Sequence, residues 1–84
     1  MSATLHRVIR CVQDVFKNKG AEAPALSADT ALTPELGLDS LDYAELVVRL
    51  EGEFGFDPFA SGAGREIRTM ADLASFYEQN RSLP

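Results

Sequence analysis

One serine stands where its hydroxyl could do chemistry. Ser40 follows Asp39 and precedes Asp42 at the expected start of a helix. A hydroxyl at such a position can attack a substrate or can cap the helix. Attack needs a base, and no histidine or lysine lies within helical reach of Ser40. By itself, therefore, the residue is best interpreted as a helix-capping serine.

The single cysteine and the single histidine do not suggest a catalytic or metal site. Cys11 and His6 are five residues apart in an expected helix, with Cys11 beside the apolar face and His6 well off it. One thiol and one imidazole cannot complete a zinc site unless carboxylates supply the other ligands. We expect Cys11 to be a packing residue and His6 to be solvated. Without a nucleophile, base or metal constellation, the chain is not expected to be an enzyme.

The composition is that of one small globular domain spanning residues 1–84. The hydrophobic content of 45% suits a folded core, and 13 acids against 8 bases give a formal net charge of −5. An acidic chain without tryptophan or a basic run is a poor match for nucleic acid and favours basic partners. No apolar run approaches the roughly 20 residues of a membrane span, and no signal-peptide core is present. We expect a cytoplasmic monomer.

Apolar spacing predicts a first helix over about residues 3–18. Its apolar residues recur every three or four positions and share one face: Leu5, Val8, Ile9, Val12, Val15 and Phe16. Gly20 follows, and it suits the left-handed end of a helix. Residues 20–38 contain two prolines and no sustained period, which predicts a long loop with one helical turn near Glu35. Four leucines would anchor this loop to the core: Leu26, Leu32, Leu36 and Leu38.

The second helix has apolar residues on two opposite sides. We expect it to begin at Asp39 or Ser40 and to end near Phe54. Its core face holds Tyr43, Leu46, Val47, Leu50 and Phe54. A second strip on the other side consists of Leu41, Ala44 and Val48, flanked by Asp42 and Glu45. So small a protein can hardly bury both sides. The second strip is either a set of ordinary surface residues or a docking site rimmed by acids.

The rest of the chain predicts one more main helix and one short one. Thr69 and Asp72 resemble a capping box that starts a last helix ending near Asn80. Between residues 58 and 67 two glycines allow only a short, frayed helix, and we expect residues 58–66 to be loosely held. No segment alternates like a strand. The expected fold is all-α: a small four-helix bundle of three main helices and one short helix, with a long loop between the first two.

The residues around Ser40 resemble the attachment motif of acyl carrier proteins. Residues 35–42 read ELGLDSLD, which is similar nearly letter for letter to that family's LGxDSL motif. The similarity continues to residue 54, and residues 67–73, IRTMADL, resemble the start of the family's last helix. Together these segments span most of the chain from residue 32 onward. DSL alone is common, whereas this combination at the family's spacing is specific.

The resemblance implies a covalent cofactor on Ser40. A separate phosphopantetheinyl transferase would move 4′-phosphopantetheine from coenzyme A to the hydroxyl, and the arm's thiol would carry acyl groups as thioesters. Ser40 would be an anchor and not a catalyst, because the transferase supplies the magnesium and the base. Gly37 would allow the turn that presents Ser40 outward, and Asp39 would flank the hydroxyl. A phosphodiester at the first turn of a helix is stabilised by the order of 0.3–1 kcal/mol.

The resemblance also assigns the second apolar strip and its acids to partner binding. Leu41, Ala44 and Val48 would fill apolar notches on partner enzymes, while Asp42 and Glu45 would meet basic surfaces. These partners would be the transferase and the enzymes that load and transfer acyl groups in fatty-acid, lipid or secondary-metabolite synthesis.

Two residues of the second helix depart from the pattern of general fatty-acid carriers. Gly52 stands where many of those carriers have an acid, and Arg49 stands where many of them have a small residue. The acidic surface is thinner as a result, which favours a dedicated carrier for a particular lipid or secondary product.

Two other interpretations share many of these residues. A peptidyl, aminoacyl, aryl or polyketide carrier would keep the same serine and meet a different loading enzyme. An unmodified helical interaction module would use Ser40 only as a cap and would bind a partner helix through Leu41, Ala44 and Val48.

Overall fold

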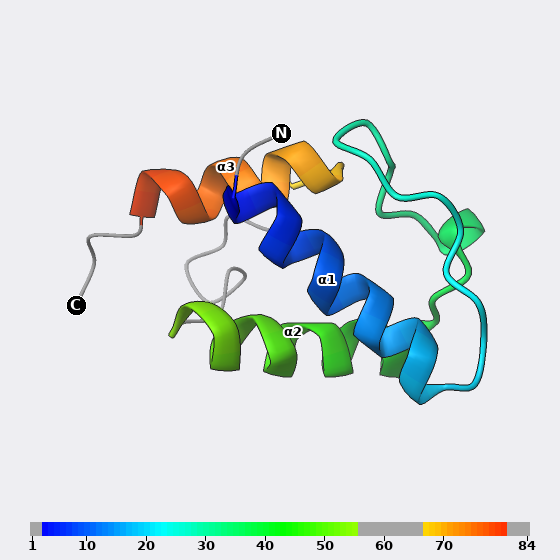
Figure 1. Cartoon of the computed structure of the whole chain (residues 1–84). Coiled ribbons are helices and arrows are strands. Elements are labelled where there is room, and N and C mark those ends of the chain that lie inside the picture. Colours follow the sequence, from blue (N-terminus) through cyan, green and yellow to red (C-terminus); the bar gives the residue numbers. More distant parts are fainter. Residues whose placement is uncertain (1–2, 56–66, 81–84) are drawn as a thin grey trace.

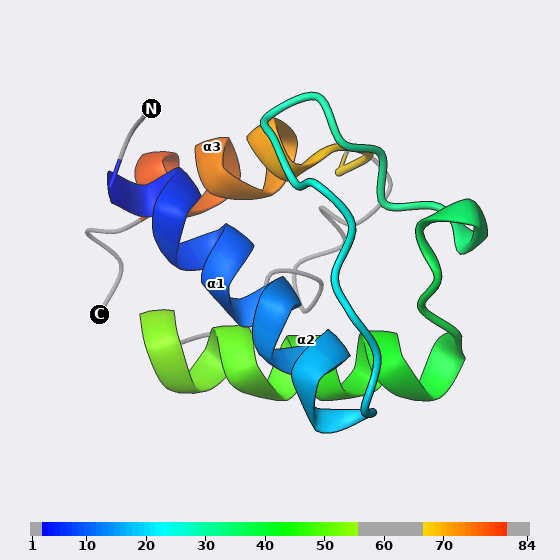
Figure 2. The same ribbon diagram turned by 45° about the vertical axis from the view of Figure 1, so that its right-hand side comes forward.

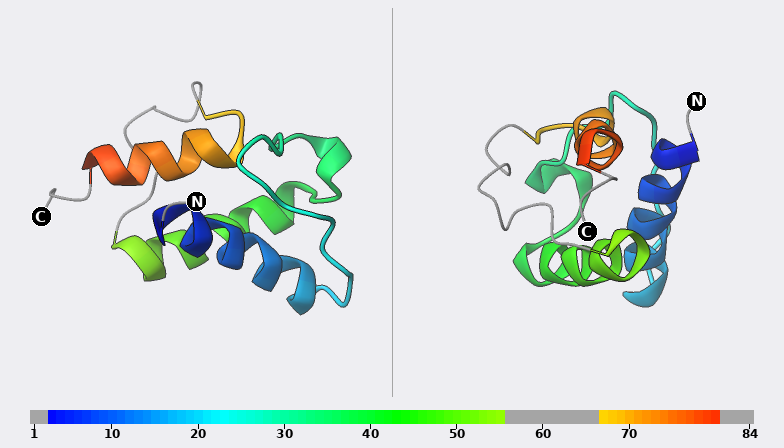
Figure 3. Two further views of the ribbon diagram at one scale, coloured as in Figure 1. Left: turned by 45° about the horizontal axis from the view of Figure 1, so that its top comes forward. Right: turned by 90° about the vertical axis from the view of Figure 1, so that its left-hand side faces the viewer.

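Three α-helices and one 3₁₀ turn make up the described part of the chain. The computed structural model describes residues 3–55 and 67–80. In chain order the elements are α1 (Ala3–Asn18), η1 (Pro34–Leu36), α2 (Ser40–Phe54) and α3 (Met70–Asn80). Helix α1 packs against both α2 and α3 (Figure 1), and Figure 3 shows it alongside α2 from two further directions. The described residues contain no strand beyond one isolated bridge between Ala31 and Thr69.

Helix α1 forms and ends as its sequence predicts. All six apolar residues of the predicted face are buried, as is Cys11 at its flank. The helix ends in a left-handed glycine, Gly20, whose φ is +77°. The amide of Gly20 bonds the carbonyl of Lys17, and the amide of Ala21 bonds that of Phe16. This pair of bonds is a Schellman motif, which satisfies carbonyls that the helix end would otherwise leave unpaired.

The connection between α1 and α2 is fastened to the start of α3. The carbonyls of Ala28 and Thr30 accept hydrogen bonds from the amides of Ala71 and Met70, at 2.9 and 3.0 Å. The amide of Leu32 donates to the carbonyl of Arg68 at 2.7 Å. Figure 2 shows this path, from the end of α1 to the first turn of α3 and then through η1 to α2. These bonds fix the middle of the connection against the start of α3 before the chain continues to α2.

Helix α3 begins with the capping box that its sequence predicts. The amide of Asp72 donates to the Thr69 hydroxyl at 3.1 Å, and the Asp72 carboxylate accepts from the Thr69 amide at 3.1 Å and the Arg68 amide at 3.0 Å. These bonds, that of the Arg68 amide first, hold the pKa of Asp72 below its ordinary value.

One apolar core joins the three helices. Leu46 and Leu50 from α2 and Leu73 and Tyr77 from α3 are nearly or fully buried against α1. Phe54 stacks on Tyr77 with ring centroids 4.0 Å apart. The four loop leucines behave as anchors: Leu38 is buried, and Leu26, Leu32 and Leu36 pack against the core. The core face of α2 is confirmed for Leu46 and Leu50, which are buried, and for Tyr43 and Phe54, which pack partly buried against the core. Val47 is half-buried and does not belong to the core cluster, so its place in the predicted face is not confirmed.

The expected short helix at 58–67 and the loose packing of residues 58–66 fall almost wholly outside the described residues. The all-α class is confirmed for the described part of the chain. The four-helix count remains a prediction.

Candidate functional site

Ser40 is the first residue of α2, and its side chain is exposed. The N-cap is Asp39, whose extended backbone (φ −94°, ψ −175°) precedes the helix. Among the described residues the Ser40 hydroxyl has no hydrogen-bond partner. The interpretation of Ser40 as the capping residue is therefore wrong, because Asp39 does that work and the serine hydroxyl stays available.

The cap is a reciprocal box between Asp39 and Asp42. The Asp42 amide donates to Asp39 Oδ1 at 2.9 Å, and the Asp39 amide donates to Asp42 Oδ2 at 3.1 Å. Both carboxylates are thus used to hold the turn that carries Ser40. Negative charge here also complements the positive end of the α2 dipole.

Lys19, from just beyond α1, braces the same turn. Its Nζ lies 2.6 Å from Asp42 Oδ2 and 3.1 Å from the carbonyl oxygen of Gly37. The hydrogen bond from Lys19 is the main cause of an Asp42 pKa below the ordinary value, and the same bond raises the pKa of Lys19. Asp42 as a whole is only 8% exposed. It was expected to meet partners directly, but its carboxylate faces Lys19 and the cap, so little of it is left for a partner.

Gly37 supplies a backbone conformation that other residues rarely adopt. Its φ is +106°, and a Cβ added there would lie 3.5 Å from the ring of Phe16, an ordinary contact. The requirement for glycine is therefore conformational and not one of space. The turn at Gly37 brings the chain from the core-anchored segment to Asp39 and Ser40.

The second apolar strip of α2 is exposed. We call Leu41, Ala44 and Val48 the apolar strip. Leu41 is 79% exposed and Val48 is 67% exposed, and these are the exposed large hydrophobic residues of the described chain. Ala44 between them is exposed as well. The strip begins directly after Ser40 and runs down the face of α2 away from the core.

Acids beside the apolar strip are bound to bases of the same chain. Glu45 Oε2 lies 2.9 Å from Arg49 Nε, and both Glu45 oxygens accept from the side-chain amide of Asn18 at 3.2 Å. Further along α2, the Glu53 carboxylate lies 2.5 Å from Arg7 Nε. The contacts between α1 and α2 could not be predicted from the sequence, because they depend on how the two helices pack. The Glu45–Arg49 pair could have been predicted, because residues four apart on a helix are neighbours.

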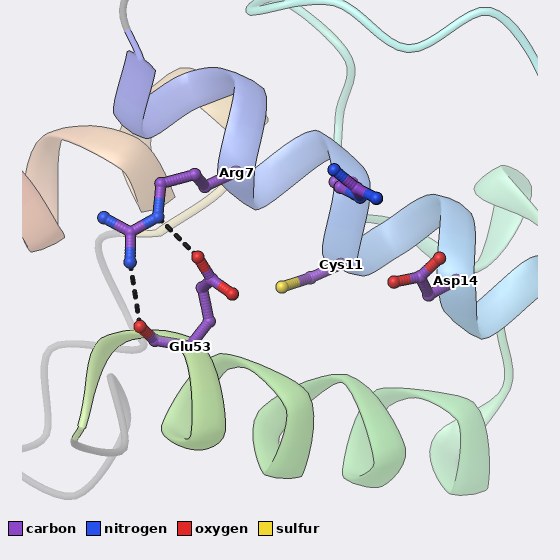
Figure 4. A pocket seen from close by; sticks show the side chains of 5 residues that line it. Arg7, Cys11, Asp14 and Glu53 are labelled. Carbon is purple, nitrogen blue, oxygen red and sulfur yellow. Dashed lines mark hydrogen bonds and ion pairs between the residues drawn. The ribbon is translucent and has the colours of Figure 1, made fainter.

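Cys11 lies near a small polar hollow between α1 and α2. The hollow holds about 170 Å³ and is lined by Arg7, Arg10, Cys11, Asp14 and Glu53. In Figure 4 Arg7 reaches both the carboxylate and the backbone carbonyl of Glu53, and the Cys11 sulfur points toward α2. Burial raises the pKa of Cys11 to about 11. Burial and the raised pKa both disfavour the thiolate, which is consistent with a packing residue.

Comparison with known proteins agrees with this arrangement. Residues 6–76 match the family model described as the phosphopantetheine attachment site. The chain belongs to the acyl carrier protein family. It is 29% identical over 76 residues, 90% of this chain and 84% of the relative, to an acyl carrier protein of Rickettsia bellii.

A solved carrier has the same fold. The solution structure of MacpD, an acyl carrier protein from Pseudomonas fluorescens involved in mupirocin biosynthesis, superposes with a TM-score of 0.76. The two chains are 38% identical, and the match covers 95% of this chain and 71% of that one.

The start of α2 fits the cofactor of this family, 4′-phosphopantetheine. The Ser40 hydroxyl is exposed, and within the described chain the amides of Ser40 and Leu41 have no hydrogen-bond partner. Unpaired amides at a helix start favour an anionic group, and the nearby Asp42 charge is offset by Lys19. Across the described ranges, no helix is long and apolar enough to cross a membrane, and no three potential metal ligands lie together.

Proposed function

We propose that this protein carries acyl groups as thioesters on 4′-phosphopantetheine attached to Ser40. The observation that supports the attachment point is the exposed, uncommitted hydroxyl of Ser40 on a turn that Asp39, Asp42 and Gly37 hold in place. The arm supplies a thiol, and the protein supplies the anchor and the surface that enzymes recognise. In this proposal the protein itself does not catalyse the transfer, because the carboxylates beside Ser40, those of Asp39 and Asp42, are bound in the cap and to Lys19 and not to the serine hydroxyl.

Partner enzymes would dock on the apolar strip. Leu41 lies next to Ser40 and Val48 lies two turns along α2, so an enzyme seated on both would have Ser40 at the edge of its contact. The first such partner is the phosphopantetheinyl transferase, and the others load and remove acyl groups. Exposed apolar side chains with a polar surround are typical of surfaces that bind several partners in turn.

The reduced acidity of α2 favours a dedicated pathway over general fatty-acid synthesis. Arg49 binds Glu45 on the face where an acidic carrier would present free carboxylates. The similarity to a carrier involved in mupirocin biosynthesis supports the same assignment. We propose that the cargo is an intermediate of a specialised lipid or secondary metabolite.

Modification of the purified protein tests the attachment point. The unmodified chain is incubated with coenzyme A, Mg²⁺ and a promiscuous phosphopantetheinyl transferase, and the intact mass is measured. We expect a gain of one phosphopantetheine arm, and none in Ser40→Ala. Ser75→Ala, which removes another exposed serine hydroxyl from a helix, is the matched control and should be modified like the parent. Unchanged modification of Ser40→Ala would refute the assignment.

Loading of the modified protein separates an acyl carrier from an aminoacyl carrier. Acyl-activating and aminoacyl-activating enzymes are each offered the modified chain with their own substrates. We expect thioester formation with the first group. Loading by the aminoacyl enzymes alone would favour the peptidyl carrier.

A further inference from the structure

The side of α2 that faces α1 carries three carboxylates, and each is bound to a base. Asp42 lies 2.6 Å from Lys19, Glu45 lies 2.9 Å from Arg49, and Glu53 is paired with Arg7. Figure 4 shows the last of these pairs across the α1–α2 seam. Lys19 and Arg7 belong to the α1 side, and Arg49 comes from α2 itself.

Few free charges remain on α2 for a partner to recognise. In the described part of the chain Glu51 is the one carboxylate of α2 without a basic partner. A carboxylate already bound to a cation attracts a second cation weakly, because the field of the pair falls off faster than that of a single charge. Salt screens what remains over about 8 Å at physiological ionic strength. The acids counted in the sequence therefore overstate the negative field of this face.

Of these bases, Arg49 holds the acid that lies between Leu41 and Val48 on the helix. Its partner Glu45 is four residues after Leu41 and three before Val48, so Glu45 neighbours both on the helix surface. The side chains of Arg49 and Glu45 are about one-third exposed, at 35% and 31%. They lie where a docked enzyme would meet them, whereas Asp42, with a side chain 11% exposed, is more deeply placed than Glu45.

We propose that Arg49 makes this carrier selective for enzymes that offer an apolar socket and few cations opposite Glu45. The inference rests on the proposed function and specifies the partner surface that the carrier accepts. Leu41 and Val48 supply the attraction, and Arg49 both cancels the charge of Glu45 and repels a strongly basic surface. An enzyme adapted to a highly acidic carrier would bind this one poorly.

A transferase with a basic carrier-binding surface tests the proposal. Initial rates of modification are measured against the concentration of unmodified protein, at about 50 mM and about 300 mM salt. We expect Arg49→Ala to lower KM about threefold to tenfold at low salt with little change in kcat, and the gain to shrink at high salt. The dissociation constant of the same pair without coenzyme A should fall in parallel.

Two matched variants exclude a general charge effect. Arg10→Ala removes the same charge from α1, where Arg10 lines the hollow near Cys11 and makes no ion pair with Glu45, and should shift KM much less. Arg49→Lys keeps the charge and should resemble the parent. Equal shifts for Arg10→Ala and Arg49→Ala, or no shift for Arg49→Ala, would overturn the inference while leaving the proposed function intact. A parent chain that is never modified would overturn both.

Discussion

Lys19 and Asp42 join the end of α1 to the first turn of α2, with Nζ and Oδ2 2.6 Å apart. The same Lys19 nitrogen donates to the carbonyl of Gly37. Two elements that are distant in sequence thus fix the backbone on both sides of Ser40. The site is held by the packing of α1 on α2 as well as by its local motif.

Removing this brace should loosen the turn around Ser40. Lys19→Met keeps much of the apolar stem and loses both hydrogen bonds, so we expect the thermal midpoint to fall by a few degrees. Lys17→Met removes an exposed lysine without a partner among the described residues and should leave the midpoint nearly unchanged. Circular dichroism melts at neutral pH measure both. Equal midpoints for the two variants would show that the brace contributes nothing.

Stability should decline in acid because two aspartates have lowered pKa values. The bond from Lys19 lowers the pKa of Asp42, and the Arg68 amide is the first cause for Asp72. Each contribution is fully present above the ordinary aspartate pKa of about 4 and is lost as the pH falls through the lower folded value. Thermal midpoints between pH 7 and pH 2.5 should fall less steeply for Asp72→Asn than for the parent. Parallel curves would contradict this assignment.

Replacing Gly37 or Gly52 by alanine should change the free energy of unfolding in opposite directions. Gly37→Ala places a Cβ on a residue with φ of +106° and should cost about 1–2 kcal/mol of unfolding free energy. Gly52→Ala lies inside α2, where a Cβ meets open space, and should stabilise by about 0.5–1 kcal/mol. Urea unfolding measures both. A neutral Gly37→Ala would mean that the turn relaxes without strain.

Cys11 should be silent toward thiol reagents in the folded protein. With its pKa raised to about 11 from 9.0, about a hundredfold less thiolate is present at pH 8 than for an unperturbed group. Ellman's reagent should therefore detect almost no thiol in the folded, unmodified chain and one thiol in urea. After modification the native protein should show one fast-reacting thiol. Fast reaction of the unmodified native chain would disprove the protected state of Cys11.

Local patterns predicted the elements of this fold well. The apolar period gave the bounds of α1, and Thr69 and Asp72 gave the start of α3, because both signals lie within one or two helical turns. The exposed apolar strip was likewise visible as a second face on α2, since packing at this size leaves one side uncovered.

Relationships between distant segments could not be predicted in the same way. The bonds of Lys19 to Asp42 and of Arg7 to Glu53 depend on how α1 crosses α2, which no local spacing encodes. The assignment of the cap was also ambiguous, because Asp39 and Ser40 are both good capping residues and only the backbone conformation distinguishes them. The cap and the Lys19–Asp42 bond hold the turn that presents Ser40, so this part of the site could be described only from the structure.

The most direct test is the chemical state of Ser40 in protein recovered from its native host while the pathway is active. Intact-mass measurement followed by peptide mapping should find one phosphopantetheine arm, and that arm should lie on the peptide containing Ser40. Protein that is entirely unmodified at that residue, or that carries the arm elsewhere, would contradict the account.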